Sequence, residues 1–97
     1  MRERDIEAKL RQAIEKDGGL FFKFVSPGND GVPERLAVLP GGRIYFIELK
    51  TDRGRLSPLQ VWQQDRLRQL GVNVAVIRGM DEAAAFIEEV RDAIPTT

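Results

Sequence analysis

The sequence predicts an α/β domain in which helices pack on a mixed four-stranded sheet, in the order α-β-β-β-α-β-α. The chain has 97 residues, a length that suits one domain spanning residues 1–97. Apolar residues recur at helical spacing near both ends of the chain, whereas apolar and polar residues alternate in its middle. A helical segment also separates the last two strand segments, which permits a parallel crossover between them.

One helix and three strands are predicted for the first half of the chain. Ile6, Leu10 and Ile14 recur at helical spacing, and the Gly-Gly pair at 18–19 would end this helix. A Phe-rich strand follows and ends at a loop of Ser, Pro, Gly, Asn and Asp residues. The next two strands flank a Pro-Gly-Gly turn, which predicts a hairpin. These four elements cover residues 2–17, 20–25, 35–39 and 43–50.

A second helix is predicted from Ser57 onwards. Ser57 supplies a hydroxyl N-cap, and Pro58 stands at the first helical position, where no N–H is needed. On the helical wheel Leu59 and Leu70 lie on the apolar side, and Gln60 lies at the rim of that side. This prediction places Gln60 beside the sheet, one turn into the helix.

A strand and a third helix complete the predicted fold. Residues 72–77 are rich in Val and are expected to form a strand in the interior of the sheet. Asp81 is then expected to cap the last helix. Its apolar periodicity continues through residues 93–94, and Pro95 would stop it.

The composition excludes several classes of catalytic site. The chain contains no Cys and no His, so it has no thiolate nucleophile, no thiolate zinc site, no Ser-His-Asp triad and no imidazole base. Acid-base chemistry or metal binding must therefore fall to Asp, Glu, Lys or Tyr. Carboxylate oxygens are the ligands that hard cations such as Mg²⁺ or Mn²⁺ prefer.

The apolar segments predict neither export nor membrane insertion. No apolar stretch follows the charged residues 1–5, so a signal peptide is not expected. The longest apolar-rich run, residues 44–49, contains Glu48 and is far shorter than the roughly 20 residues of a membrane helix. A cytoplasmic location is the resulting expectation.

The charges balance overall but are unevenly distributed. Residues 18–79 hold nine Lys or Arg against five Asp or Glu, whereas residues 80–97 hold one against five. A basic middle with an acidic tail is typical of a protein that meets phosphate on one face. A solvated surface with chance clustering is the alternative that this distribution leaves open.

Glu48 and Lys50 are expected on one face of the third strand. Residues two apart on a strand share a face and lie about 7 Å apart. A carboxylate inside an apolar strand needs a partner or a metal to offset its lost hydration. An acidic residue two before a lysine is common by chance, so a plain solvent-facing pair remains the alternative.

Three further polar residues are expected near this strand end. Glu34 follows a rigid Gly-Val-Pro turn and would lie close to Glu48 if the two strands are antiparallel neighbours. Two carboxylates held that close need a cation between them. Glu7 and Gln60 both lie at the rims of apolar helix stripes, where each is individually explained by ordinary boundary polarity.

Three segments carry a resemblance to a known family. Residues 31–34 (Gly-Val-Pro-Glu), 47–50 (Ile-Glu-Leu-Lys) and 56–60 (Leu-Ser-Pro-Leu-Gln) occur in this order. With Lys23 before the loop, they resemble the VRR-NUC family, a branch of the PD-(D/E)XK nuclease superfamily. The resemblance covers residues 7–78. It implies a restriction-endonuclease-like core and an endonuclease that hydrolyses phosphodiester bonds with Mg²⁺ or Mn²⁺ as cofactor.

The resemblance also implies a set of metal ligands. Glu34 and Glu48 would hold the metal together with the backbone carbonyl of Leu49. Glu7 would contribute directly or through water. The family usually has Asp where this chain has Glu34, and the extra methylene moves the carboxylate by more than about 1 Å. Reduced or metal-selective activity is therefore expected.

The remaining roles follow from the same resemblance. Lys50 would orient or deprotonate the attacking water and stabilise charge that grows on the phosphate. Gln60 would support Lys50 or that water. Base-specific cutting is not expected, because no base-reading element is recognisable. The candidates for contacts to DNA phosphates are Lys23, Arg53 and Arg55.

Branched or junction DNA is the substrate that the resemblance implies, because stand-alone family members resemble Holliday-junction resolvases. One site per chain cannot cut two strands symmetrically, so a homodimer is expected, assembled through the strands and the Phe-rich residues 21–24. The alternative is that both faces of this Phe-rich strand are internal. Two alternatives remain at this point. One is a nuclease-fold DNA-binding or interaction module that has lost catalysis, and the other is a structural protein in which Glu48 and Lys50 form only an ion pair.

Overall fold

The predicted order of helices and strands is the order observed. The computed structural model describes residues 2–92. The expected end of the last helix at residues 93–95 therefore lies outside the described residues. The elements are α1 (Glu3–Lys16), β1 (Leu20–Lys23), β2 (Arg35–Leu39), β3 (Arg43–Lys50), α2 (Pro58–Gln69), β4 (Asn73–Arg78) and α3 (Gly79–Asp92).

The four strands form one mixed sheet in the order β1-β2-β3-β4. β1 pairs with β2, and β2 pairs with β3, in antiparallel orientation, and β3 pairs with β4 in parallel orientation through the α2 crossover. The predicted hairpin between β2 and β3 is confirmed. Its turn needs positive φ angles of 86° at Gly41 and 76° at Gly42, which glycine adopts without steric cost.

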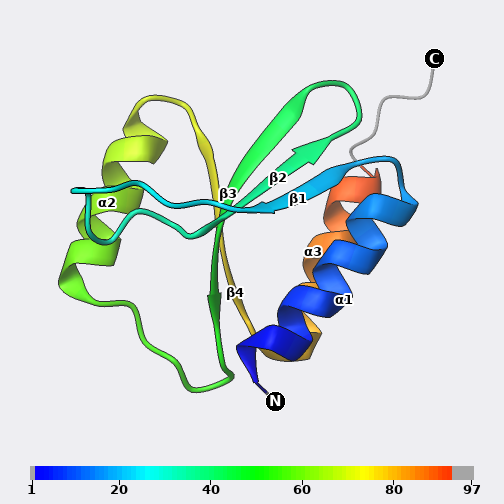
Figure 1. Ribbon diagram of the computed structural model, residues 1–97, viewed down its shortest axis with the longest axis horizontal. Coiled ribbons are helices and arrows are strands. Elements are labelled where there is room, and N and C mark those ends of the chain that lie inside the picture. The colour runs from blue at the N-terminus through cyan, green and yellow to red at the C-terminus, as the bar shows by residue number, and fades with distance from the viewer. Residues whose placement is uncertain (1, 93–97) are drawn as a thin grey trace.

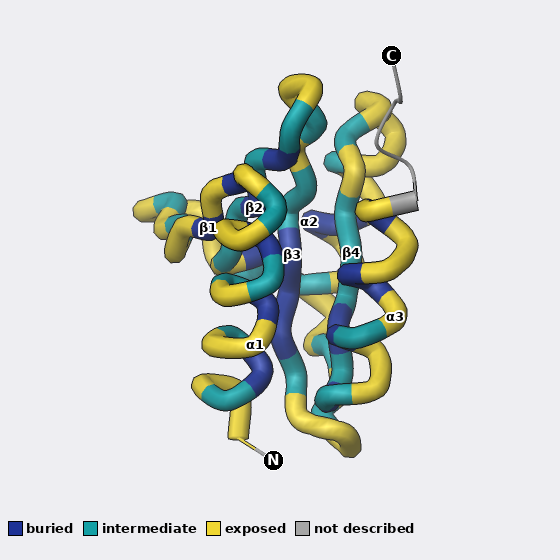
Figure 2. Tube along the Cα trace, turned by 90° about the vertical axis from the view of Figure 1, so that its right-hand side faces the viewer, coloured by how far each residue is buried: buried dark blue, intermediate teal, exposed yellow. Residues whose placement is uncertain are grey.

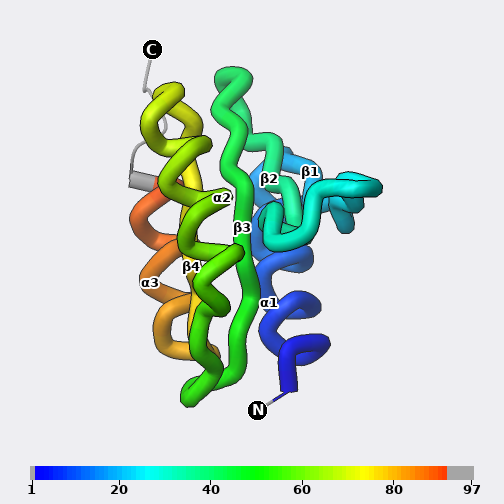
Figure 3. Tube along the Cα trace, turned by 90° about the vertical axis from the view of Figure 1, so that its left-hand side faces the viewer, coloured from blue at the N-terminus to red at the C-terminus, as the bar shows by residue number. Residues whose placement is uncertain are grey.

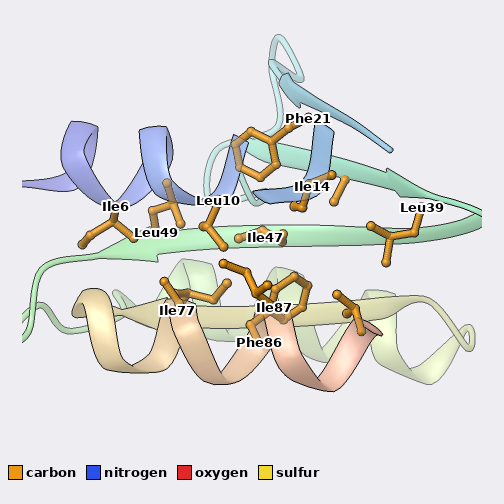
Figure 4. Packing of buried hydrophobic residues seen from close by; sticks show 13 residues of the cluster. Ile6, Leu10, Ile14, Phe21, Leu39, Ile47, Leu49, Ile77, Phe86 and Ile87 are labelled. Atoms are coloured by element: carbon orange, nitrogen blue, oxygen red, sulfur yellow. The ribbon is translucent and has the colours of Figure 1, made fainter. Parts of the chain in front are cut away.

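The two faces of the sheet are covered unequally. α1 and α3 lie together on one face, and α2 lies on the other (Figures 1–3). Apolar side chains of α1, α3 and the facing strands build the core, as expected for an amphipathic helix on a sheet (Figure 4). The largest buried side chains of this core include Ile6, Leu10, Phe21, Ile47 and Ile77. Central strand β3 is buried over most of its second half (Figure 2).

Two sequence-based expectations about β4 and α3 were wrong in detail. β4 is an edge strand, and its Val-rich sequence reflects helices on both of its faces rather than a strand on each side. α3 begins at Gly79, two residues before the expected cap Asp81. The carboxylate of Glu82 instead accepts a hydrogen bond from the backbone N–H of Arg78 (2.9 Å) at the start of this helix.

The orientation of α2 also differs from the helical wheel. Leu59 is 43% exposed and Leu70 is 82% exposed, whereas Gln63 and Gln64 are buried against the rest of the protein. Two glutamines of α2 therefore lie inward, and several of its apolar side chains remain exposed. None of the helices among residues 2–92 has the length and hydropathy that crossing a bilayer requires.

Candidate active site

Glu48 lies near the C-terminal end of the inner strand β3, on the face opposite the core. Ile47 and Leu49 point into the core, so the alternation of the strand turns Glu48 toward the α2 side. The residue is 6% exposed. Burial raises the pKa of Glu48 to about 7, which the charge of Lys50 opposes. The causes of this raised pKa are burial and neighbouring charges, with no side-chain hydrogen bond among them.

Glu34 lies opposite Glu48. The antiparallel register pairs Arg35 with Ile47, and one step further along this register Glu34 faces Glu48. The backbone of Glu34 is fixed there because its carbonyl accepts a hydrogen bond from the N–H of Phe24 (2.7 Å). The charge of Glu34 contributes to the raised pKa of Glu48. The structure thus brings these two carboxylates together, one exposed and one buried.

Lys50 shares the face of Glu48 at the end of β3, and its position depends on Gly54. A Cβ atom at Gly54 would lie 3.0 Å from Lys50 Cβ and 3.3 Å from its Cδ, so the lysine stem packs directly on the glycine backbone. The N–H of Gly54 donates to the carbonyl of Thr51 (2.9 Å), and its carbonyl accepts from Arg78 Nε (2.9 Å). The sequence interpretation missed Gly54 and Arg78. A glycine four residues after the candidate lysine was the available clue.

Glu7 is held by two arginines. Arg11 Nη2 donates to Glu7 Oε1 (2.8 Å) and Arg35 Nη2 donates to Oε2 (2.7 Å). Burial acts to raise the pKa of Glu7, but the hydrogen bonds from Arg35 and Arg11 outweigh burial and hold it below its ordinary value. Within residues 2–92, no three acidic side chains form a cluster suited to a metal ion. A contribution of Glu7 to the metal site therefore stays a prediction.

Glu3 is a second acidic residue that the sequence interpretation passed over. It lies one helical turn before Glu7 on α1, and therefore on the same side of the helix. Its charge acts on Glu48 and contributes to the raised pKa of that residue. The i, i+4 spacing from Glu7 was the clue that could have identified it.

Gln60 lies at the start of α2 and takes part in the cap of that helix. Its Oε1 accepts from the N–H of Ser57 (2.9 Å), and its own N–H donates to Ser57 Oγ (3.1 Å). This reciprocal capping box confirms the predicted N-cap. The amide oxygen is thereby occupied, so any support of Lys50 or water would fall to the amide nitrogen of Gln60.

The three predicted phosphate contacts are all exposed. Lys23 ends β1 and lines a pocket together with Glu34. Arg53 and Arg55 lie in the loop that follows Lys50, at the same end of β3. All three cations are therefore available at the surface near the candidate site.

Comparison with known proteins places this geometry in context. No family model matches the chain. A protein of Acyrthosiphon pisum secondary endosymbiont phage 1 named "Putative nuclease p44" is 43% identical over 81 residues, which are 84% of this chain and 87% of that protein. A solved structure described as "VRR_NUC domain" superposes with a TM-score of 0.83 at 31% identity, covering 89% of this chain and 94% of the other. Both similarities extend over most of each chain.

Proposed function

The chain belongs to the VRR-NUC family within the PD-(D/E)XK nuclease superfamily, and on this basis we propose that it is a metal-dependent endonuclease acting on DNA. One observation carries the proposal: the buried residue Glu48, whose pKa is raised by burial and by the charge of Glu34, lies opposite Glu34, and Lys50 lies on the same face. This set of groups suits phosphodiester hydrolysis and offers little to a purely structural role, because burying such a carboxyl group is costly.

The donor set fits a hard divalent cation. Glu34 and Glu48 offer carboxylate oxygens, and Leu49 offers a backbone carbonyl in the same strand, so all three donors are oxygen atoms. A cation between the carboxylates would offset the repulsion and the lost hydration that raise the pKa of Glu48. When bound, Mg²⁺ or Mn²⁺ would lower the pKa of a water molecule and neutralise charge on the phosphate.

Lys50 carries the second part of the proposed chemistry. Its ammonium group is held at the strand end by the packing of its stem on Gly54. From there it would orient the attacking water and stabilise negative charge that develops on the phosphate oxygens. The surrounding cations Lys23, Arg53 and Arg55 would hold the neighbouring phosphates of the DNA strand.

We further propose that the substrate is branched or junction DNA and that the enzyme acts as a homodimer. The observation in favour of a dimer is the exposure of large apolar side chains on β1 and α2. Phe21 is buried, but Leu20 and Phe22 of β1 are 52% and 46% exposed, and Trp62 of α2 is 53% exposed. Exposed large apolar side chains of this kind favour an interface between subunits. A dimeric mass at micromolar concentration that Phe22→Asp reduces to a monomer is expected, and a monomeric wild type would contradict the dimer.

A cleavage assay tests the proposed activity. Labelled four-way junction, flap and linear duplex are incubated with Mg²⁺, Mn²⁺ or EDTA, using the wild type and Lys50→Ala. Metal-dependent cleavage of the junction or flap, lost in the variant, is expected. Binding without cleavage in either metal would favour a DNA-binding module that has lost catalysis, for which the longer side chain of Glu34 is the specific observation. If the protein neither binds nor cleaves any of these DNAs, the remaining alternative is a structural protein.

A further inference from the structure

The loop between β1 and β2 lines a solvent-open pocket beside the candidate active site. This pocket has a volume of about 390 Å³, and its wall includes Lys23, Phe24, Val25 and Glu34. Its size is within the range of about 300–1,000 Å³ that is usual for small-ligand pockets. Glu34 lines this pocket and also lies opposite Glu48 on the neighbouring strand. The pocket therefore adjoins the pair of carboxylates.

The loop that forms the pocket has a defined internal structure. The N–H of Asn29 donates to the carbonyl of Ser26 (3.1 Å), and its side-chain amide donates to Ser26 Oγ (3.0 Å). Pro27 and Gly28 occupy the two central positions of this turn, and Gly28 has the positive φ of 78° that the third position of a type II turn requires. A ligand would therefore find the loop already ordered, which lowers the entropy lost on binding.

The far side of the loop is attached to α2 (Figure 1). Gln63, which is 8% exposed, donates its side-chain amide to the carbonyl of Asp30 (3.1 Å). Gly31 lies so close to α2 that a Cβ atom there would be 2.9 Å from the side chain and backbone oxygen of Leu59. The hydrogen bond gives buried Gln63 a partner, and the two contacts together hold the loop against α2.

The wall of the pocket combines the groups that bind a nucleotide. Phe24 offers an aromatic surface, and its ring is held edge-on against Phe46 with the centroids 5.4 Å apart. Lys23 offers a cation for a phosphate, and the loop backbone offers polar atoms for a base edge. Two carboxylates in the wall, Asp30 and Glu34, would repel a phosphate group. We therefore expect the phosphate beside Lys23 and the base beside the loop.

We propose that this pocket takes one unpaired nucleotide that neighbours the phosphodiester bond to be cut. The proposal rests on the proposed nuclease function and adds a reason for selecting structured DNA. A paired base must leave its stack to enter a pocket of this kind, at a cost of about a few kcal/mol, whereas a branch point or flap presents unpaired bases at lower cost. Selection of the substrate would then come from the β1–β2 loop rather than from contacts to base sequence.

A binding experiment with two matched DNA duplexes tests the pocket. One duplex is fully paired, and the other carries a single-nucleotide bulge that contains 2-aminopurine. Binding is measured by fluorescence at low salt in EDTA, where no metal-dependent cleavage occurs. The wild type is expected to bind the bulged duplex at least about 10-fold more tightly and to quench 2-aminopurine by stacking. A wild type without this preference would overturn the proposal.

Variants of two exposed valines distinguish the effect of filling the pocket from the effect of a bulky side chain elsewhere on the surface. Val25 lines the pocket and is 67% exposed, so Val25→Trp fills the pocket without removing core packing. Val61 is 42% exposed on α2 outside the pocket, so Val61→Trp is the matched control. Val25→Trp is expected to abolish the preference for the bulge and to leave binding of paired DNA unchanged, whereas Val61→Trp retains the preference. A preference that survives Val25→Trp would overturn the proposal.

A cleavage assay with Mg²⁺, performed alongside, keeps this proposal distinct from the proposed function. Metal-dependent cleavage without any preference for the bulge would retain the nuclease and exclude the nucleotide pocket. A preference that Val25→Trp abolishes, without cleavage in any metal, would retain the pocket and exclude the nuclease.

Discussion

Glu48 couples the stability of the metal-free protein to pH. Its pKa of about 7 in the folded state lies above the ordinary value of 4.5, so the folded protein holds a proton there that the unfolded chain releases. The contribution to stability is full below pH 4.5 and is lost as the pH rises through 7. In EDTA the free energy of unfolding should therefore fall by about 1–3 kcal/mol between pH 5 and pH 8, as measured by urea denaturation.

The neutral variant Glu48→Gln isolates this effect. Its free energy of unfolding should change less than that of the wild type over the same pH interval, because the titrating group is gone. Equal pH dependence of the wild type and Glu48→Gln would show that Glu48 is not protonated in the folded protein at pH 5.

Gly54 positions Lys50 without touching substrate. In Gly54→Ala the new Cβ would lie 3.0 Å from Lys50 Cβ, so the lysine stem must shift. Misplacement of a catalytic group by about 1 Å can cost 10²-fold in rate. We expect kcat for DNA cleavage to fall at least 10-fold, with KM and the unfolding transition little changed. A variant with wild-type kcat would exclude this role of Gly54.

At the scale of the elements, the ion pair of Glu7 and Arg35 joins α1 to β2. The side chain of Arg35 is only 13% exposed, and its Nη1 also donates to the carbonyl of Glu34 (3.1 Å). Loss of the Glu7 charge would leave this arginine buried and poorly paired. Glu7→Gln should therefore reduce the free energy of unfolding by about 1–3 kcal/mol in urea denaturation.

The exposed pair of Asp65 and Arg68 on α2 supplies a control for this prediction. These side chains are 61% and 46% exposed, and their closest charged atoms are 3.9 Å apart. Asp65→Asn should change stability by less than about 0.5 kcal/mol. An equal effect of Glu7→Gln and Asp65→Asn would show that Glu7 does not link the helix to the sheet.

Helices with a clear periodicity of apolar residues could be predicted from the sequence together with their buried face. For α2 the helix was predicted, but its buried face was not. The apolar spacing of Ile6, Leu10 and Ile14 predicted the buried face of α1 because only packing decides that face. On α2 Gln63 is buried and donates a hydrogen bond to the β1–β2 loop, whereas Leu59 is 43% exposed. Tertiary contacts of this kind have no periodic pattern in the sequence.

At the scale of the whole molecule, the proximity of Glu34 to Glu48 was predictable, but the surroundings of Glu7 were not. A tight turn fixes the register of a hairpin, so the position of the Pro-Gly-Gly sequence determines which residues of β2 and β3 face each other. The contact of Glu7 with Arg35 instead spans 28 residues and depends on how α1 packs on the sheet. Local sequence carries no information on that packing.

The central claim is that the ends of β2 and β3 hold a divalent metal between Glu34 and Glu48. Calorimetric titration of Mn²⁺ into the wild type, Glu34→Ala, Glu48→Gln and Glu34→Asp tests it most directly. We expect one site per chain in the wild type and at least about 10-fold weaker binding in Glu34→Ala and Glu48→Gln. Glu34→Asp should keep the site, because it restores the usual side chain of the family. Tight binding that Glu34→Ala leaves unchanged would contradict the account.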